Sequence, residues 1–432
     1  MSAGGTWTKQ NKVRPGIYIN FRGKQVTTMS IGDRGTVALP LELNWGESGK
    51  VITVDLATNF VKTLGYELGS KELLLIREAL KRANKVLLYR TNSGGTKASG
   101  IVGGLTIKAA SEGIRGNDIN VSVTKDSDKY VIKTYLDEIL QDSQAVTDIA
   151  EFKSNQLITI EGEIEETAGV NLTGGANAAA GNNYQTALEA LKTQSWNVFA
   201  LCGGIGTTKA SLVAYIKNLR ENEGKYVVGV MSEYPEADYE GIISVKNGVT
   251  LQDGTELTAA QACAWVAGAT AAAAVNESLT NTPYDGAVGT TPMLDSEVTT
   301  ALIAGEFVFI DDGGKASVEE DINSLTTFTE DKPSDLRKNR VLRVLDAIGN
   351  DLRVNLRNIF IGKVGNDSDG RDLVKADAIS YIQELQKIRA VDEFETEDVE
   401  VQKGDSSESI LLNIAVKPVD AIEKIYTTIL VN

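Results

Sequence analysis

An alternation of helix-like and strand-like segments, beginning at residue 184, constrains the fold most strongly. Apolar residues recur at helical spacing over 184–191 and again over 212–219, and a short, mostly apolar run follows each stretch, at 196–201 and 226–230. A strand without a polar face must be covered on both sides, as in parallel sheets that carry helices on each face. The pattern therefore predicts an α/β domain built on a parallel or mixed sheet.

The same pattern occurs once earlier in the chain and is then interrupted. A helix-like stretch that Ser70 can cap leads into an apolar strand at 86–89. From 94 to about 180 the chain is rich in Gly, Thr, Ser and Asn and in short alternating runs, which are typical of a small β domain. We therefore predict a discontinuous α/β domain over 26–93 and 181–330, with a β domain inserted over 94–180.

An alanine-rich stretch at 258–275 is the longest uncharged apolar run. It is short for a bilayer span and Gln261 interrupts it, so a buried helix is the better interpretation. The start of the chain also lacks the apolar core of a signal peptide. We expect a soluble protein that is made in the cytoplasm.

A long basic helix is predicted after residue 331. Ser334 can cap it, and its apolar residues recur at intervals of four and three up to Ile359, provided that Gly349 does not break it. Four arginines fall on the side opposite this apolar stripe: Arg340, Arg343, Arg353 and Arg357. This face is either an ordinary solvated one or a docking surface for an acidic protein partner, to which arginine is well suited.

A smaller α+β domain is expected to contain this helix and to span 331–420. A second helix is expected near 373–389, followed by strands around 399–401 and 410–416. The acidic cluster at 392–400 offers paired carboxylates for catalysis, but no other feature of the sequence motivates that role. A solvated linker or an ionic contact surface is the default interpretation.

Each end of the chain is predicted to be an extended arm, over 1–25 and 421–432. Alternate residues of a strand share one face, and both arms show apolar residues at that spacing. The residues concerned are Ile17, Ile19 and Phe21 in the first arm, and Ile425, Thr427, Ile429 and Val431 in the second. A lone strand near a terminus needs another sheet to complete it, in this molecule or in another.

Charge and residue usage exclude much chemistry. Asp and Glu number 59 against 43 Lys and Arg, a net charge of −16, which weighs against binding free nucleic acid or an anionic membrane. The chain has no histidine, which excludes Ser-His-Asp and Cys-His catalysis and histidine-ligated metals. Its two cysteines, Cys202 and Cys263, are expected to be free and buried. We expect no cofactor.

Two runs resemble ligand-binding motifs but lack residues that the motifs require. The run CGGIGTTK at 202–209 lies where a phosphate loop would, but Thr208 stands where Gly must precede the lysine. The run NDSDG at 366–370 resembles a calcium loop, yet Gly365 and Ala376 occupy its first and twelfth ligand positions. Both runs are therefore interpreted as turns.

Short motifs spread over the whole chain resemble those of one family. They are RPGIYINF at 14–21, GIRGNDI at 113–119, LTGGA at 172–176, DINSLTT at 321–327, RKNR at 337–340, IGKVGND at 361–367, VKPVD at 416–420 and EKIY at 423–426. In this order they are similar to the contractile tail sheath proteins of bacteriophages and phage-like elements, in particular those of defective prophages of Gram-positive bacteria.

The resemblance implies a structural role and no enzyme activity. It implies a subtilisin-like α/β domain without catalytic residues, an outer position for the inserted β domain and a tube-facing 331–420 domain. The terminal arms would add strands to neighbouring subunits, giving a helical cylinder that contracts around an inner tail tube and drives it through a bacterial envelope. The implied partners are further copies of the chain, the tube protein, and baseplate and tail terminator proteins, without nucleic acid or membrane insertion.

The implied location is a virion tail or phage-tail-like particle, assembled from protein made in the bacterial host cytoplasm. Two alternatives stay open from the residues alone. One is a carboxylate-dependent hydrolase on the α/β scaffold, and the other is a self-assembling surface or adhesion protein. Electron microscopy separates all three functions. A sheath subunit predicts sheath-like tubes, a hydrolase predicts discrete globular particles, and a surface or adhesion protein predicts two-dimensional arrays.

Overall fold

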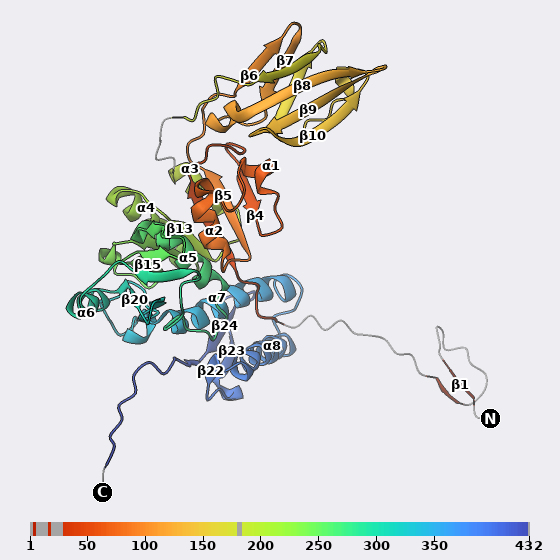
Figure 1. Ribbon diagram of the computed structural model, residues 1–432. Helices are drawn as coiled ribbons and strands as arrows, with labels where there is room; N and C mark the ends of the chain where they lie inside the picture. The colour runs from red at the N-terminus through yellow and green to blue at the C-terminus, as the bar shows by residue number, and fades with distance from the viewer. Residues whose placement is uncertain (1–2, 6–15, 19–28, 179–183, 431–432) are drawn as a thin grey trace.

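The computed structural model describes residues 3–5, 16–18, 29–178 and 184–430 (Figure 1). Its largest sheet has seven strands. In order across the sheet they are β19 (Glu306–Phe307), β15 (Ile242–Val245), β14 (Val228–Ser232), β13 (Val198–Leu201), β3 (Thr36–Leu41), β5 (Lys85–Arg90) and β4 (Val51–Val54). Neighbouring strands run parallel except for the edge pair of β5 and β4.

Helices cover both faces of this sheet, as the alternating pattern predicts. One face packs against α2 (Leu74–Leu80) and α5 (Ala259–Ala272), and the other against α3 (Tyr184–Lys192) and α4 (Gly206–Lys217). The strands divide their side chains between the two layers, so that in β13 Val198 and Ala200 face α5 while Phe199 and Leu201 face α4. This double burial explains why the strands of the sheet are predominantly apolar.

Helix α5 is the alanine-rich stretch, and it lies buried against the sheet. Thr258 and Gln261 form a capping box at its start. Small residues let it approach α2 closely: a Cβ at Gly268 would lie 2.4 Å from the Ala79 carbonyl oxygen. Among the described residues, no helix is both long and apolar enough to cross a membrane.

The β-rich segment between β5 and α3 forms two sheets around its own core. One contains β10 (Ile139–Val146), β9 (Lys129–Leu136), β8 (Ile119–Asp126) and β12 (Thr167–Asn171), and the other contains β11 (Ile158–Gly162), β7 (Leu105–Ala109) and β6 (Ser99–Val102). Figure 1 shows this β insertion at one end of the molecule. Its incoming and outgoing chains are joined by two bridges, between Thr96 and Ala176 and between Ser99 and Thr173.

Shorter elements surround the central sheet. They are α1 (Phe60–Leu64), the sheet of β17 (Glu256–Leu257), β16 (Val249–Leu251) and β18 (Ala287–Thr290), the pair β20 (Phe309–Asp311) and β21 (Ala316–Val318), and α6 (Asp295–Ile303). Trp265, Tyr284 and Phe309 pack ring against ring beneath them.

Two long helices and two strand pairs follow residue 331. The helices are α7 (Asn339–Ile359) and α8 (Ser368–Lys387), and the pairs are β22 (Val391–Asp392) with β25 (Lys417–Pro418) and β23 (Val399–Lys403) with β24 (Ile410–Ile414). Gly349 does not break α7. The predicted start was wrong: Ser334–Arg337 forms a separate 3-10 turn, because extended backbone at Lys338 separates it from α7.

Both ends of the described chain are extended. At the start, β1 (Ala3–Gly5) pairs in parallel with β2 (Gly16–Tyr18), which includes Ile17. Ile19, Phe21 and Val431 lie outside the described residues. After β25 the chain runs away from the body of the molecule (Figure 1), and 419–430 forms neither helix nor strand.

Candidate assembly site

The final segment, 421–430, is an apolar strand-like chain without a sheet; we call it the C-terminal arm. Its large side chains are exposed, with Ile425 at 80%, Tyr426 at 92% and Leu430 at 86% of their full accessibility. Within the described residues, the backbone of 422–430 makes no hydrogen bond. Apolar side chains and free backbone groups together are the properties of a strand that pairs with another chain.

Glu423 holds the base of this arm to the body of the molecule. Its carboxylate accepts a hydrogen bond of 2.7 Å from the Thr280 hydroxyl and forms an ion pair with Lys338, which also pairs with Glu320. Burial acts to lower the pKa of Lys338, but the hydrogen bonds from its ammonium group to Glu320 and Glu423 outweigh it and raise that pKa. Lys338 lies in the RKNR motif and Glu423 in the EKIY motif, but the sequence does not predict their contact, because only the fold brings these two motifs together.

The four predicted arginines of α7 do not form one exposed face. Arg343 is buried, with a hydrogen bond to the Glu277 carbonyl oxygen and an ion pair of 3.4 Å to Asp321. Arg340 is half-buried and donates to the Asn276 carbonyl oxygen over 2.8 Å. The prediction was wrong for Arg343, because the first half of α7 is enclosed by other parts of the chain and has no solvent side.

Arg353 and Arg357, in the second half of α7, are exposed. Neither forms an ion pair with any carboxylate in the described part of the chain. They are the members of the predicted basic face that are free to meet a partner.

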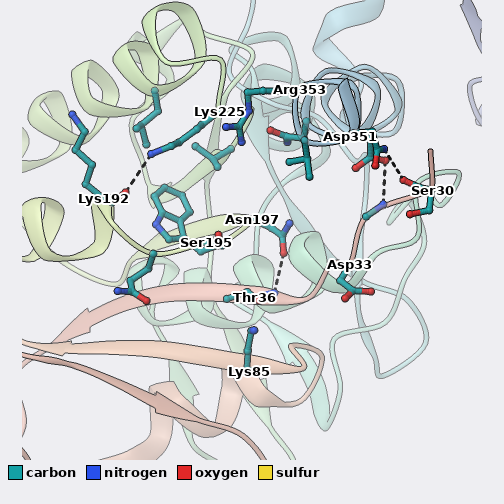
Figure 2. Close-up of a pocket in the computed structure, with 18 of the residues that line it drawn as sticks. Ser30, Asp33, Thr36, Lys85, Lys192, Ser195, Asn197, Lys225, Asp351 and Arg353 are labelled. Atoms are coloured by element: carbon teal, nitrogen blue, oxygen red, sulfur yellow. Dashed lines mark hydrogen bonds between the residues drawn. The ribbon is translucent and has the colours of Figure 1, made fainter. Parts of the chain in front are cut away.

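A cleft of about 400 Å³ lies beside Arg353 (Figure 2). We call it the basic cleft, because Lys85, Lys192, Lys225 and Arg353 line it. The amino ends of β3, β5, β13 and β14 meet the second half of α7 there, and Asn197 fixes the start of β3 by accepting a 3.0 Å hydrogen bond from the Thr36 amide. The sequence analysis did not predict this cleft. The one feature of the sequence that points to it is a lysine at or just before the start of two apolar strands, Lys85 and Lys225.

Among the lysines of the basic cleft, two already share a carboxylate. Lys192 and Lys225 lie 2.6 and 3.3 Å from Glu223. The hydrogen bond from Lys192, followed by that from Lys225, lowers the pKa of Glu223. Beneath these charges the floor is apolar, with Trp196 and Tyr215 stacked at 6.4 Å between ring centroids.

The rejected motifs have structural roles. Lys209 of the glycine-rich run donates over 2.7 Å to the Ser232 carbonyl oxygen, and Asp367 caps α8 by accepting from the Gly370 amide over 2.8 Å. Cys263 is buried in α5, and Cys202 is partly buried, where desolvation raises the pKa of its thiol to about 12. In the ranges that the structure covers, no three His, Cys, Asp or Glu side chains are grouped to hold a metal ion.

Comparison with known families gives matches along nearly the whole chain. In chain order they are the tail sheath protein Gp18 domain III N-terminal region at 34–91, the phage tail sheath protein beta-sandwich domain at 93–177, the phage tail sheath protein central domain at 177–324 and the phage tail sheath C-terminal domain at 331–432.

Individual relatives agree with these matches. The phage-like element PBSX protein XkdK of Bacillus subtilis (strain 168) is 37% identical over 99% of this chain and 100% of that protein. The crystal structure of the sheath tail protein of Desulfitobacterium hafniense matches with a TM-score of 0.85 and 44% identity over 95% of this chain and 99% of that one. The sheath tail protein of Listeria innocua matches with a TM-score of 0.82 and 35% identity over 93% and 95% of the two chains.

The fold, the exposed arm and these matches place the chain among the structural proteins of phage tails. It belongs to the phage tail sheath family and is a structural sheath subunit.

Proposed function

We propose that this subunit polymerises into a helical cylinder around an inner tail tube and that contraction of the cylinder drives the tube through a bacterial envelope. The observation that carries the proposal is the C-terminal arm, whose apolar side chains and backbone groups find no partner within the described residues. Adding this arm to a neighbour's sheet would satisfy both. The N-terminal arm, residues 1–25, would pair in the same way, so that the subunits stay connected while they move.

The parts of the chain have distinct roles in this proposal. The α/β domain over 26–93 and 181–330 is a subtilisin-like scaffold used only for shape, which its mainly parallel sheet with helices on both faces supports. The insertion at 94–180 faces outward and the 331–420 domain faces the tube. Arg353 and Arg357 supply the basic surface that meets the tube.

The proposed mechanism is mechanical and needs no cofactor or catalysis. Free energy is stored when subunits assemble in an extended lattice, and a baseplate trigger releases them into a shorter, wider one. Head-to-tail contacts that do not close into a ring produce such helical lattices. The partners are further copies, the tube, the baseplate and the tail terminator, within a tail particle assembled in the bacterial host cytoplasm.

Deleting residues 425–432 tests the role of the arm. The shortened chain keeps Glu423 and its contacts at the base of the arm, so we expect a folded monomer that forms no tubes in electron micrographs. A matched control keeps the length and replaces 425–432 with a Gly-Ser sequence, which cannot supply the apolar strand. Tubes of normal length from either variant contradict the proposal.

A further inference from the structure

The basic cleft keeps a positive charge that the subunit neutralises only in part. Lys85, Lys192, Lys225 and Arg353 line it, against the carboxylates of Asp33 and Asp351 and against Glu223, which pairs with Lys192 and Lys225. Asp351 is already engaged, since it accepts hydrogen bonds of 2.7 Å from the Tyr381 hydroxyl and 3.1 Å from the Gly32 amide.

Two of the four cations have no ion pair at all within the described chain, namely Lys85 and Arg353. Figure 2 shows Lys85 and Arg353 approaching the cleft from opposite sides, with Ser195 and Asn197 between them. Two unpaired cations that face one cleft, in a protein of net charge −16, favour an acidic ligand there.

The shape of the cleft limits that ligand to a small segment. A volume of about 400 Å³ over an apolar floor of Trp196, Tyr215, Leu219 and Val227 holds a few side chains and not a folded domain. A peptide turn with two or more carboxylates would place its charges on the lysines and the arginine while its stem covered the floor.

The chain itself carries such a turn between β22 and β23, around the 3-10 turn η7 (Thr396–Asp398). We call residues 395–400 the acidic turn. Glu395 and Glu397 are exposed, and the carboxylates of this turn form no ion pair with any described residue. The Glu395 amide donates a hydrogen bond of 2.8 Å to the Asp398 carboxylate within the turn, and the Asp398 carbonyl oxygen accepts one of 2.9 Å from the Ala415 amide, which holds the turn against the neighbouring strand.

We infer that the basic cleft of one subunit binds the acidic turn of a second copy of this chain. The inference rests on the proposed function, because it requires copies to assemble. The two surfaces consist of different residues, so the contact is heterologous and extends a polymer without closing on itself. It adds a salt-sensitive contact to the strand pairing of the arms.

Charge reversal on each side tests the contact in tube-free assembly, followed by light scattering and electron microscopy at low salt. The cleft variant is Lys85→Glu with Lys225→Glu, and the turn variant is Glu395→Lys with Glu397→Lys. Each should raise the protein concentration needed for assembly about tenfold, and combining all four changes should restore it. A control with the same charge change as the cleft variant, Lys129→Glu with Lys153→Glu, should assemble like the parent.

Cross-linking gives a second measurement that does not depend on how reversal affects folding. In parent-like polymers of Lys85→Cys with Glu397→Cys, a short bismaleimide should join successive subunits into a ladder. Any of four results overturns the inference. The cleft variant assembles at the parent's concentration, or the variant with all four changes does not recover. Alternatively, no ladder forms, or Lys85→Cys becomes cross-linked to a tube protein instead. Failure of the parent itself to form tubes would count against the proposed function.

Discussion

At the scale of single residues, a buried ion pair ties the α/β core to α7. The guanidinium of Arg220 donates two hydrogen bonds of 2.7 Å to Asp346, and both side chains are buried. Arg220→Ala leaves this carboxylate without its main partner, so we expect the free energy of unfolding to fall by about 3–5 kcal/mol. Urea unfolding followed by tryptophan fluorescence measures it. Arg357→Ala, an exposed arginine of the same helix, should change it by less than about 0.5 kcal/mol, and equal effects would contradict the argument.

Asp238 makes stability depend on pH. Partial burial works to raise its pKa, but hydrogen bonds from Thr327 and Thr326 outweigh this and lower it to about 2. Because the folded-state pKa lies below the unfolded value of about 3.9, the stabilisation is complete above that pH and is lost as the pH falls towards 2. Asp238→Asn should therefore remove part of the acid sensitivity, seen as a smaller change in melting temperature between pH 5 and pH 3. An unchanged difference would rule out this role.

At the scale of elements, close contact between α2 and α5 should outweigh helix propensity. Alanine is favoured over glycine in a helix by about 1 kcal/mol, yet a Cβ at Gly268 would meet the backbone of Ala79. We expect Gly268→Ala to destabilise the protein by about 1–3 kcal/mol. Gly206→Ala is the matched control: it lies in α4 with open space around it, and it should be neutral or stabilising. Thermal unfolding of both variants checks the opposite signs.

The exposed half of α7 gives the prediction for tube docking. Exposed ion pairs contribute about 0.2–1 kcal/mol each and weaken with salt, which suits a contact that must break when the sheath leaves the tube. Arg353→Glu with Arg357→Glu should fold. Because Arg353 also lines the basic cleft, tube-free polymers should need a higher protein concentration, and at that concentration the variant should still not assemble on purified tubes. Lys129→Glu with Lys153→Glu carries the same charge change on the β insertion and should assemble on them. Normal tube-templated assembly by the arginine variant, at low and moderate salt, would reject the docking role.

The elements themselves could be predicted well from periodicity. The sequence predicted α5 and most strands of the parallel sheet, because burial on both faces leaves a predominantly apolar pattern. The predicted arginine face was wrong for Arg343, because helical spacing tells which residues share a side but not whether that side meets solvent. Arg343 shares a side with Arg357, yet its half of the helix lies inside the protein.

At the scale of the whole molecule, the basic cleft could not be predicted, because its residues come from strand ends and a helix that are distant in sequence.

The β insertion should be removable without unfolding the α/β core. Replacing 98–174 with a short Gly-Ser linker keeps the pairing partners Thr96 and Ala176 close, so we expect the α/β core to fold. Trp45, buried by the insertion, becomes exposed and should shift its fluorescence to longer wavelength. Loss of cooperative unfolding would contradict this expectation.

The bridges at the base of the β insertion also affect how such a protein can diversify. Because Ser99 and Thr173 are hydrogen-bonded to each other, whatever lies between them begins and ends at one point of the surface. Recombination can therefore exchange this segment as a cassette without altering the path of the chain through the core. A particle built from many copies would display the new segment at every subunit. If the insertion faces outward, as we propose, the outer coat of the particle would change its charge or its recognised epitopes within one genetic event, while the lattice beneath stayed the same.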